Sequence, residues 1–173
     1  MLKSDKIQQP DPGLMNEIIE GVKILHEKLK YASFKPDIIM SFSRSSQIIG
    51  GMLAANFDDV EVINIPKKSV EVGNIIKHKM IVYGNGMKLT PEYYADKKIL
   101  IVYMAINRGR GLEKAMDYLW GLDIKGDFKV ATIYMGNMSR EIFQDILYFK
   151  EIENFKNTFN NFPWVIEQYH FDG

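Results

Sequence analysis

The stretch KILIVYMAINRGRGLEKAM, residues 98–116, contains the strongest strand signal of the chain. Its first seven residues, 98–104, are Lys98 and then six apolar residues, a run of the kind found in strands that are buried on both faces. A polar turn with two glycines follows at 107–111. Apolar residues then recur at the spacing of a helix: Leu112, Ala115, Met116 and Leu119. The stretch therefore predicts a strand, a loop and a helix in that order.

The same order occurs earlier in the chain. The run 38–42 predicts another buried strand, and the turn 43–46 leads from it into a helix with apolar residues from Ile48 onward. Before this unit, an Asp-Pro pair marks the start of a helix over 12–31. Two strand–turn–helix units thus lie in one chain.

The remaining segments complete the pattern less regularly. Strands are expected over 60–65 and 128–135, and a short helix over 139–149. An irregular flap is expected over 67–96, with a hairpin turn at Gly84-Asn85-Gly86 because an Asn-Gly pair readily takes positive φ angles. The tail, about 150–173, forms a hood in this interpretation.

Strands that alternate with helices predict an α/β fold. We expect one domain over 1–173, with a mainly parallel sheet and helices on both faces. Its central strands are expected at 38–42, 61–65, 99–103 and 129–135. Ligands of such sheets bind at the carboxyl ends of the strands. The two turns that follow 38–42 and 98–104 are therefore the candidate site.

Composition narrows the classes of function. Lys and Arg number 22, and so do Asp and Glu, so no overall charge attracts nucleic acid or a membrane surface. Cysteine is absent and the three histidines are scattered, so neither disulfides nor a metal site is expected. No signal peptide or membrane-spanning run is recognisable, and we expect a cytoplasmic protein.

The turn 107–111 has the chemistry of an anion site. Gly109 and Gly111 open a helix directly after a buried strand, so backbone N–H groups can face a phosphate, and Asn107 begins the turn. Arg108 and Arg110 add positive charge. In the alternative interpretation, the glycines only permit the turn and both arginines are solvated.

The order of three segments, 35–44, 97–102 and the Phe-Pro-Trp at 162–164, resembles the type I phosphoribosyltransferases. The resemblance is to their small purine-salvage branch, which acts on xanthine, guanine or hypoxanthine, and it covers roughly 14–167. It implies a Rossmann-like fold and a site for phosphoribosyl diphosphate.

The chain departs from this family at the residues that carry the chemistry. Tyr103 and Met104 occupy the places of an acidic pair that holds the ribose hydroxyls in the family. Asn107 and Arg108 replace the Asp-Thr of the phosphate-binding loop, and Gly109 is retained. The loop changes from negative to positive, which favours anion binding and disfavours a cationic transition state.

Two further sets of residues are assigned by the resemblance. Ser43, Arg44 and Ser45 fall at the family's diphosphate-binding turn, and Phe162 and Trp164 fall where the tail stacks on the base. The alternatives are a surface arginine at a helix start, and aromatic residues that only pack in the core.

The sequence therefore predicts a phosphoribosyltransferase-like protein that binds a nucleotide, a phosphorylated ribose or a similar anion, with lost or impaired catalysis and no cofactor. One alternative is an active transferase that uses phosphoribosyl diphosphate and Mg²⁺, with acids recruited from Glu113 or Asp117. Another is a non-catalytic domain that binds a protein partner. A homodimer is also expected.

Overall fold

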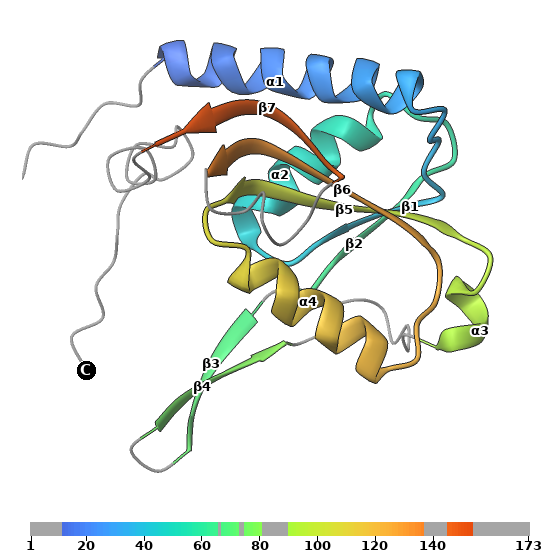
Figure 1. Ribbon diagram of the computed structural model, residues 1–173, viewed down its shortest axis with the longest axis vertical. Helices are drawn as coiled ribbons and strands as arrows, with labels where there is room; N and C mark the ends of the chain where they lie inside the picture. The colour runs from blue at the N-terminus through green and yellow to red at the C-terminus, as the bar shows by residue number, and fades with distance from the viewer. Residues whose placement is uncertain (1–11, 66, 73–74, 81–89, 137–144, 154–173) are drawn as a thin grey trace, which may run out of the picture.

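The computed structural model describes residues 12–65, 67–72, 75–80, 90–136 and 145–153, and Figure 1 shows their arrangement. The elements in chain order are α1 (Pro12–Tyr31), β1 (Ile38–Ser41), α2 (Arg44–Ala54), β2 (Glu61–Asn64), β3 (Lys67–Val72), β4 (Ile75–Met80), α3 (Pro91–Tyr94), β5 (Lys98–Ile106), α4 (Arg110–Gly121), β6 (Asp127–Gly136) and β7 (Ile146–Ile152). The helix and the four central strands predicted from the sequence coincide with α1, β1, β2, β5 and β6.

Five of the strands form one parallel sheet in the order β2-β1-β5-β6-β7. β1 pairs with β5 in the register Ile38↔Ile99 to Ser41↔Val102, which confirms the expected parallel pairing of these two segments. β5, the strand of the opening stretch, has a neighbour on each side. The predicted α/β class with a mainly parallel sheet is confirmed.

Helices cover both faces of this sheet, and Figure 1 shows α1 and α4 on opposite sides of it. One core, against α1 and α2, is formed by Ile18, Val22, Leu25, Leu29, Ile39, Ile49, Leu53, Leu100, Val102, Met104, Ala131 and Ile133, among others. The other, against α4, includes Ile38, Met40, Ile99, Ile101, Tyr103, Leu112, Ala115, Met116 and Leu119. Neighbouring residues of β5 thus point to opposite faces. Among the described helices, none is long and apolar enough to cross a membrane.

The predicted helix over 139–149 is wrong from 146 onward, where the chain forms β7 and pairs with β6. The run Ile146-Leu147-Tyr148-Phe149 combines β-branched and aromatic residues that suit a strand, and α1 packs against it. A Cβ at Gly21 of α1 would lie 3.0 Å from side-chain atoms of Ile133 and Phe149, so glycine permits this close approach. Residues 137–144 lie outside the described part.

The flap segment contains more regular structure than expected. β3 and β4 form an antiparallel hairpin in the register Lys67↔Met80 to Val72↔Ile75, and it projects away from the sheet in Figure 1. The hairpin therefore lies earlier than the turn predicted at Gly84-Asn85-Gly86, which falls outside the described residues. The tail beyond residue 153 also falls outside them.

The direction of the strand order reverses between β1 and β5. From β1 the chain passes through α2 to β2 on one side, whereas β5, β6 and β7 follow on the other side. The helices after β1 and β5 therefore diverge at the carboxyl ends of these two strands. Ligands of open parallel sheets bind at such a reversal of strand order.

Candidate functional site

The β5–α4 turn joins the central strand to its following helix. Gly109 is the N-cap of α4 and has a φ of 75°, a left-handed conformation that a side chain disfavours. It supplies no side-chain cap for the first turn of the helix. The first N–H groups of a helix have no partner within the helix, so here they are available to a ligand.

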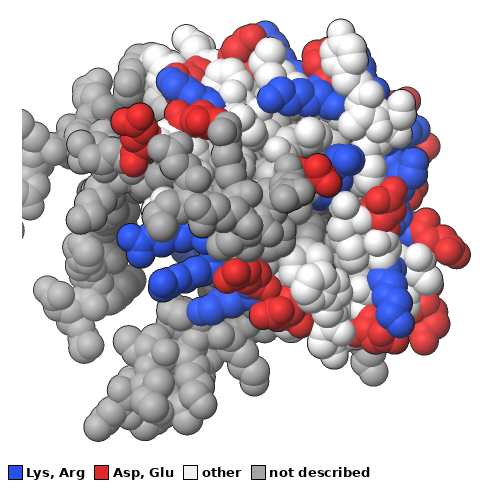
Figure 2. All heavy atoms as spheres, in the orientation of Figure 1, with Lys and Arg blue, Asp and Glu red and all other residues white. Residues whose placement is uncertain are grey.

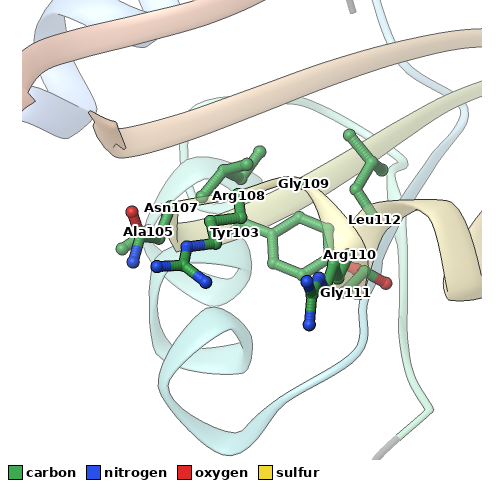
Figure 3. A pocket seen from close by; sticks show the side chains of 9 residues that line it. Tyr103, Ala105, Asn107, Arg108, Gly109, Arg110, Gly111 and Leu112 are labelled. Atoms are coloured by element: carbon green, nitrogen blue, oxygen red, sulfur yellow. The ribbon is translucent and has the colours of Figure 1, made fainter. Parts of the chain in front are cut away.

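A hollow of about 210 Å³ lies at this turn. Its described lining consists of Tyr103, Ala105, Ile106, Asn107, Arg108, Gly109, Arg110, Gly111 and Leu112. Asn107, Arg108 and Arg110 are exposed, whereas Tyr103 and Leu112 are buried. Figure 3 shows the Tyr103 ring and the side chains of Arg108 and Arg110 at this turn. The predicted phosphate-binding residues thus surround one hollow, and its described lining contains no carboxylate.

Arginines are concentrated at this edge of the sheet. The chain has four, at 44, 108, 110 and 140, against 18 lysines. Arg44 begins α2 directly after β1, and Arg108 and Arg110 follow the neighbouring strand β5. None of these three side chains forms an ion pair or a hydrogen bond with another described residue. Figure 2 shows basic side chains gathered at the left of the molecule, where the strands end.

Arginine is better suited than lysine to hold phosphate, because its planar guanidinium donates two parallel hydrogen bonds. A positive group near a helix start is electrostatically unfavourable until an anion relieves it. The arrangement of Arg108 and Arg110 around a helix start is therefore one that a bound anion stabilises.

The residues at the two ribose positions face different ways. Tyr103 lies on the α4 side, where its hydroxyl donates to the carbonyl of Gly111 at 3.2 Å and its ring stacks on Phe42 with centroids 6.4 Å apart. Burial raises the pKa of the Tyr103 hydroxyl above its ordinary value, so it stays protonated. Met104 is buried on the α1–α2 side. Only Tyr103 of the pair lines the hollow.

The β1–α2 turn is held by its serines. Ser43 caps α2 by accepting from the backbone N–H of Ser46 at 3.1 Å, and the two hydroxyl oxygens lie 2.6 Å apart. The buried Ser46 hydroxyl also accepts from the backbone N–H of Met104 at 3.2 Å. This bond links β5 to the β1–α2 turn, which contains the residues predicted to bind diphosphate: Ser43, Arg44 and Ser45.

The sequence did not predict these hydrogen bonds of the β1–α2 turn. Ser41 donates to Asn64 at 2.9 Å, and Asn64 donates to Gln47 at 3.1 Å, so the ends of β1 and β2 and the start of α2 are also linked. The Ser-x-x-Ser spacing at the start of a helix was the available signal for the cap. The bond to Met104 links residues 58 positions apart and has no local signal.

The other candidate residues are not brought to the hollow within the described chain. Glu113 and Asp117 are exposed on α4 and neither lines it. Phe162 and Trp164 lie outside the described residues, so the base-stacking assignment stays a prediction. Within the described ranges, no three His, Cys, Asp or Glu side chains gather in an arrangement that could hold a metal ion.

The sequence matches no family model and no curated protein. The fold, however, is shared with solved structures. A purine phosphoribosyltransferase from Pyrococcus horikoshii is 22% identical, with a TM-score of 0.65 over 89% of this chain and 91% of its own. A hypoxanthine-guanine phosphoribosyltransferase from Bacillus anthracis is 16% identical, with a TM-score of 0.60 over 85% and 83%.

A hypothetical protein from Neisseria gonorrhoeae with bound ppGpp is also similar, at 17% identity and a TM-score of 0.58 over 79% of this chain and 80% of its own. The resemblance to purine-salvage phosphoribosyltransferases is thus confirmed at the level of the fold: the chain has the type I phosphoribosyltransferase fold.

Proposed function

We propose that the protein binds a nucleotide or a phosphorylated ribose at the β5–α4 turn and catalyses phosphoribosyl transfer poorly or not at all. The observation that carries this proposal is the hollow itself. Two guanidinium groups without described partners, Arg108 and Arg110, flank a helix start that has no side-chain cap, and no described lining residue is acidic.

The fold supports a nucleotide as the ligand. The hollow lies where the strand order reverses, which is where open parallel sheets bind small molecules. Structures with this fold include purine phosphoribosyltransferases and a protein with bound ppGpp. With its phosphate bound by this turn, such a ligand would extend along the carboxyl edge of the sheet, where the β1–α2 turn and Arg44 follow the neighbouring strand.

Impaired catalysis follows from the charges. When diphosphate leaves phosphoribosyl diphosphate, the ribose becomes cation-like, and catalysis requires negative charge beside it. Tyr103 is neutral and Met104 points to the other face of the sheet. Arg108 adds a repulsive charge. A unit charge pair at 4 Å is worth roughly 4 kcal/mol at an effective dielectric of about 20, so the missing carboxylates represent a large loss.

An active transferase is the competing function, because two of the similar structures are such enzymes. It requires acids from outside the described lining, with Glu113 and Asp117 as the nearest candidates in sequence, and Mg²⁺ to accompany the diphosphate. Steady-state assays with phosphoribosyl diphosphate, Mg²⁺ and each common base distinguish the two. We expect rates at the uncatalysed background, and turnover of ~1 per second or faster overturns the binding-protein proposal.

A thermal-shift panel tests binding directly. Guanosine 5′-monophosphate, ribose 5-phosphate, diphosphate and ppGpp are each added to the wild-type protein and to the Arg108→Ala, Arg110→Ala variant. A ligand that binds only the native state raises the melting temperature. We expect stabilisation of the wild type alone. Equal stabilisation of the variant places the ligand elsewhere, and no stabilisation by any compound contradicts the proposal. Lys114→Ala, on the exposed surface of α4, is the matched control.

A further inference from the structure

The charged side chains that line the hollow are hydrogen-bond donors only. Arg108 and Arg110 carry donors only, and the backbone N–H groups at the start of α4 are donors too. A sugar diol that is recognised through its hydroxyl protons needs acceptors, and carboxylates bind such protons best. The hollow therefore provides abundant partners for an anion and few for a sugar.

The acceptors that line the hollow are neutral. Tyr103 has a single proton, which it donates to the carbonyl of Gly111, and this bond also occupies that carbonyl. Ala105, Ile106 and Leu112 contribute no polar side-chain atom. The amide oxygen of Asn107, an exposed residue at the entrance, is the other side-chain acceptor of the described lining.

The geometry of β5 keeps Met104, the residue after Tyr103, from lining the hollow. Residues that alternate along a strand face opposite sides of the sheet, and Met104 packs with α1 and α2 rather than with α4. Its backbone N–H is also taken, by the hydroxyl of Ser46. Binding a vicinal diol through both of its hydroxyl protons takes two acceptors side by side, and the described lining offers no carboxylate to provide them.

We infer that this site recognises the phosphate of its ligand and does not distinguish ribose from 2-deoxyribose. The inference rests on the proposed function, since it concerns the ligand of the same hollow. It assigns a specificity: the ligand class is the phosphate monoester of a nucleoside, without selection at the 2′ and 3′ hydroxyls.

The test is a series of nucleotides that differ only in the sugar. Dissociation constants are measured by calorimetry for guanosine 5′-monophosphate and for its 2′-deoxy and 2′,3′-dideoxy forms, with guanosine as the compound without phosphate. We expect the three nucleotides to agree within about 3-fold, and guanosine to bind at least about 10-fold more weakly. A hydrogen bond to a charged acceptor is worth roughly 1.5–3 kcal/mol, which corresponds to about 10-fold or more for each lost hydroxyl.

A loss of 10-fold or more on removal of either hydroxyl overturns the inference and leaves the proposed function intact. Failure of all three nucleotides to bind overturns both. Asn107→Ala provides the matched variant, because it removes the exposed amide acceptor. The ratio of ribose to deoxyribose affinity is expected to stay the same in this variant, and a changed ratio shows that Asn107 reads the sugar.

Discussion

The β1–α2 turn and the β5–α4 turn lie side by side at the carboxyl edge of the sheet, and they use their polar groups differently. In the first, Ser43 caps the helix and Ser46 bonds to the backbone of β5, so both serine side chains are used within the protein and only Arg44 lacks a described partner. In the second, a left-handed glycine begins the helix without a side-chain cap, and two arginines have no described partner. Position in the fold alone therefore does not make a ligand site. The anion is expected at the turn that leaves its donors free.

The largest expected effect comes from the arginines. Arg108→Ala combined with Arg110→Ala removes two charged donors from the hollow, and we expect affinity for guanosine 5′-monophosphate to fall at least about 100-fold, since each charged hydrogen bond contributes roughly 1.5–3 kcal/mol. Arg44→Ala is expected to cost less than about 5-fold, because Arg44 does not line the hollow. Calorimetric titration measures all three proteins. A larger loss for Arg44→Ala reverses the comparison of the two turns.

The next comparison, between Ser46→Ala and Gly109→Ala, distinguishes an effect on stability from an effect on binding. Ser46→Ala leaves the buried N–H of Met104 without its acceptor, which costs about 1–3 kcal/mol of unfolding free energy, and we expect affinity to change by less than about 3-fold. Gly109→Ala forces a side chain into the left-handed region at a cost of about 1–2 kcal/mol and also displaces the turn that holds the anion. It is expected to lose both stability and affinity.

Urea denaturation and calorimetry on the same samples measure the two quantities. Ser43→Ala serves as a companion to Ser46→Ala, with a cap loss of about 1 kcal/mol. If Ser46→Ala weakens binding as much as Gly109→Ala does, the β1–α2 turn is part of the recognition surface and not only a support for β5.

The sequence predicted what depends on local pattern. The apolar runs that became β1 and β5, and the helical spacing of Leu112, Ala115, Met116 and Leu119, are properties of neighbouring residues, so the strand–turn–helix units and their parallel pairing followed. β7 was missed because its stability comes from pairing with β6 and from α1 above it, where Lys28 donates to the carbonyl of Tyr148.

In the candidate site, too, some features could be predicted from neighbouring residues and others required the fold. The two glycines and their arginines are contiguous, and the structure places them around one hollow. The opposite directions of Tyr103 and Met104 follow from strand alternation once β5 is known. The bond from Met104 to Ser46 required the fold, because nothing local joins the two residues. The roles of Phe162 and Trp164 and the expected homodimer stay predictions.

The smallest expected effect is a dependence on pH that belongs to the ligand and not to the protein. The second pKa of a phosphate monoester is near 6, so the dianion replaces the monoanion as the pH rises from about 5 to 7. Guanidinium groups stay charged throughout this range. We therefore expect affinity for guanosine 5′-monophosphate to rise several-fold between pH 5 and 7 and then to stay level up to pH 9.

Burial keeps Tyr103 neutral over the whole range, because it raises the pKa of this hydroxyl. No loss of affinity at high pH is therefore expected from an ionised phenol beside the phosphate, and Tyr103→Phe should show the same profile as the wild type. A sulfate ester, whose charge does not change in this range, is the matched ligand and should give a flat profile. A fall in affinity between pH 7 and 9 in the wild type, absent in Tyr103→Phe, means that Tyr103 ionises in contact with the anion. The inference that the hollow offers the sugar only neutral acceptors is then wrong, although the arginine-lined turn remains the binding site.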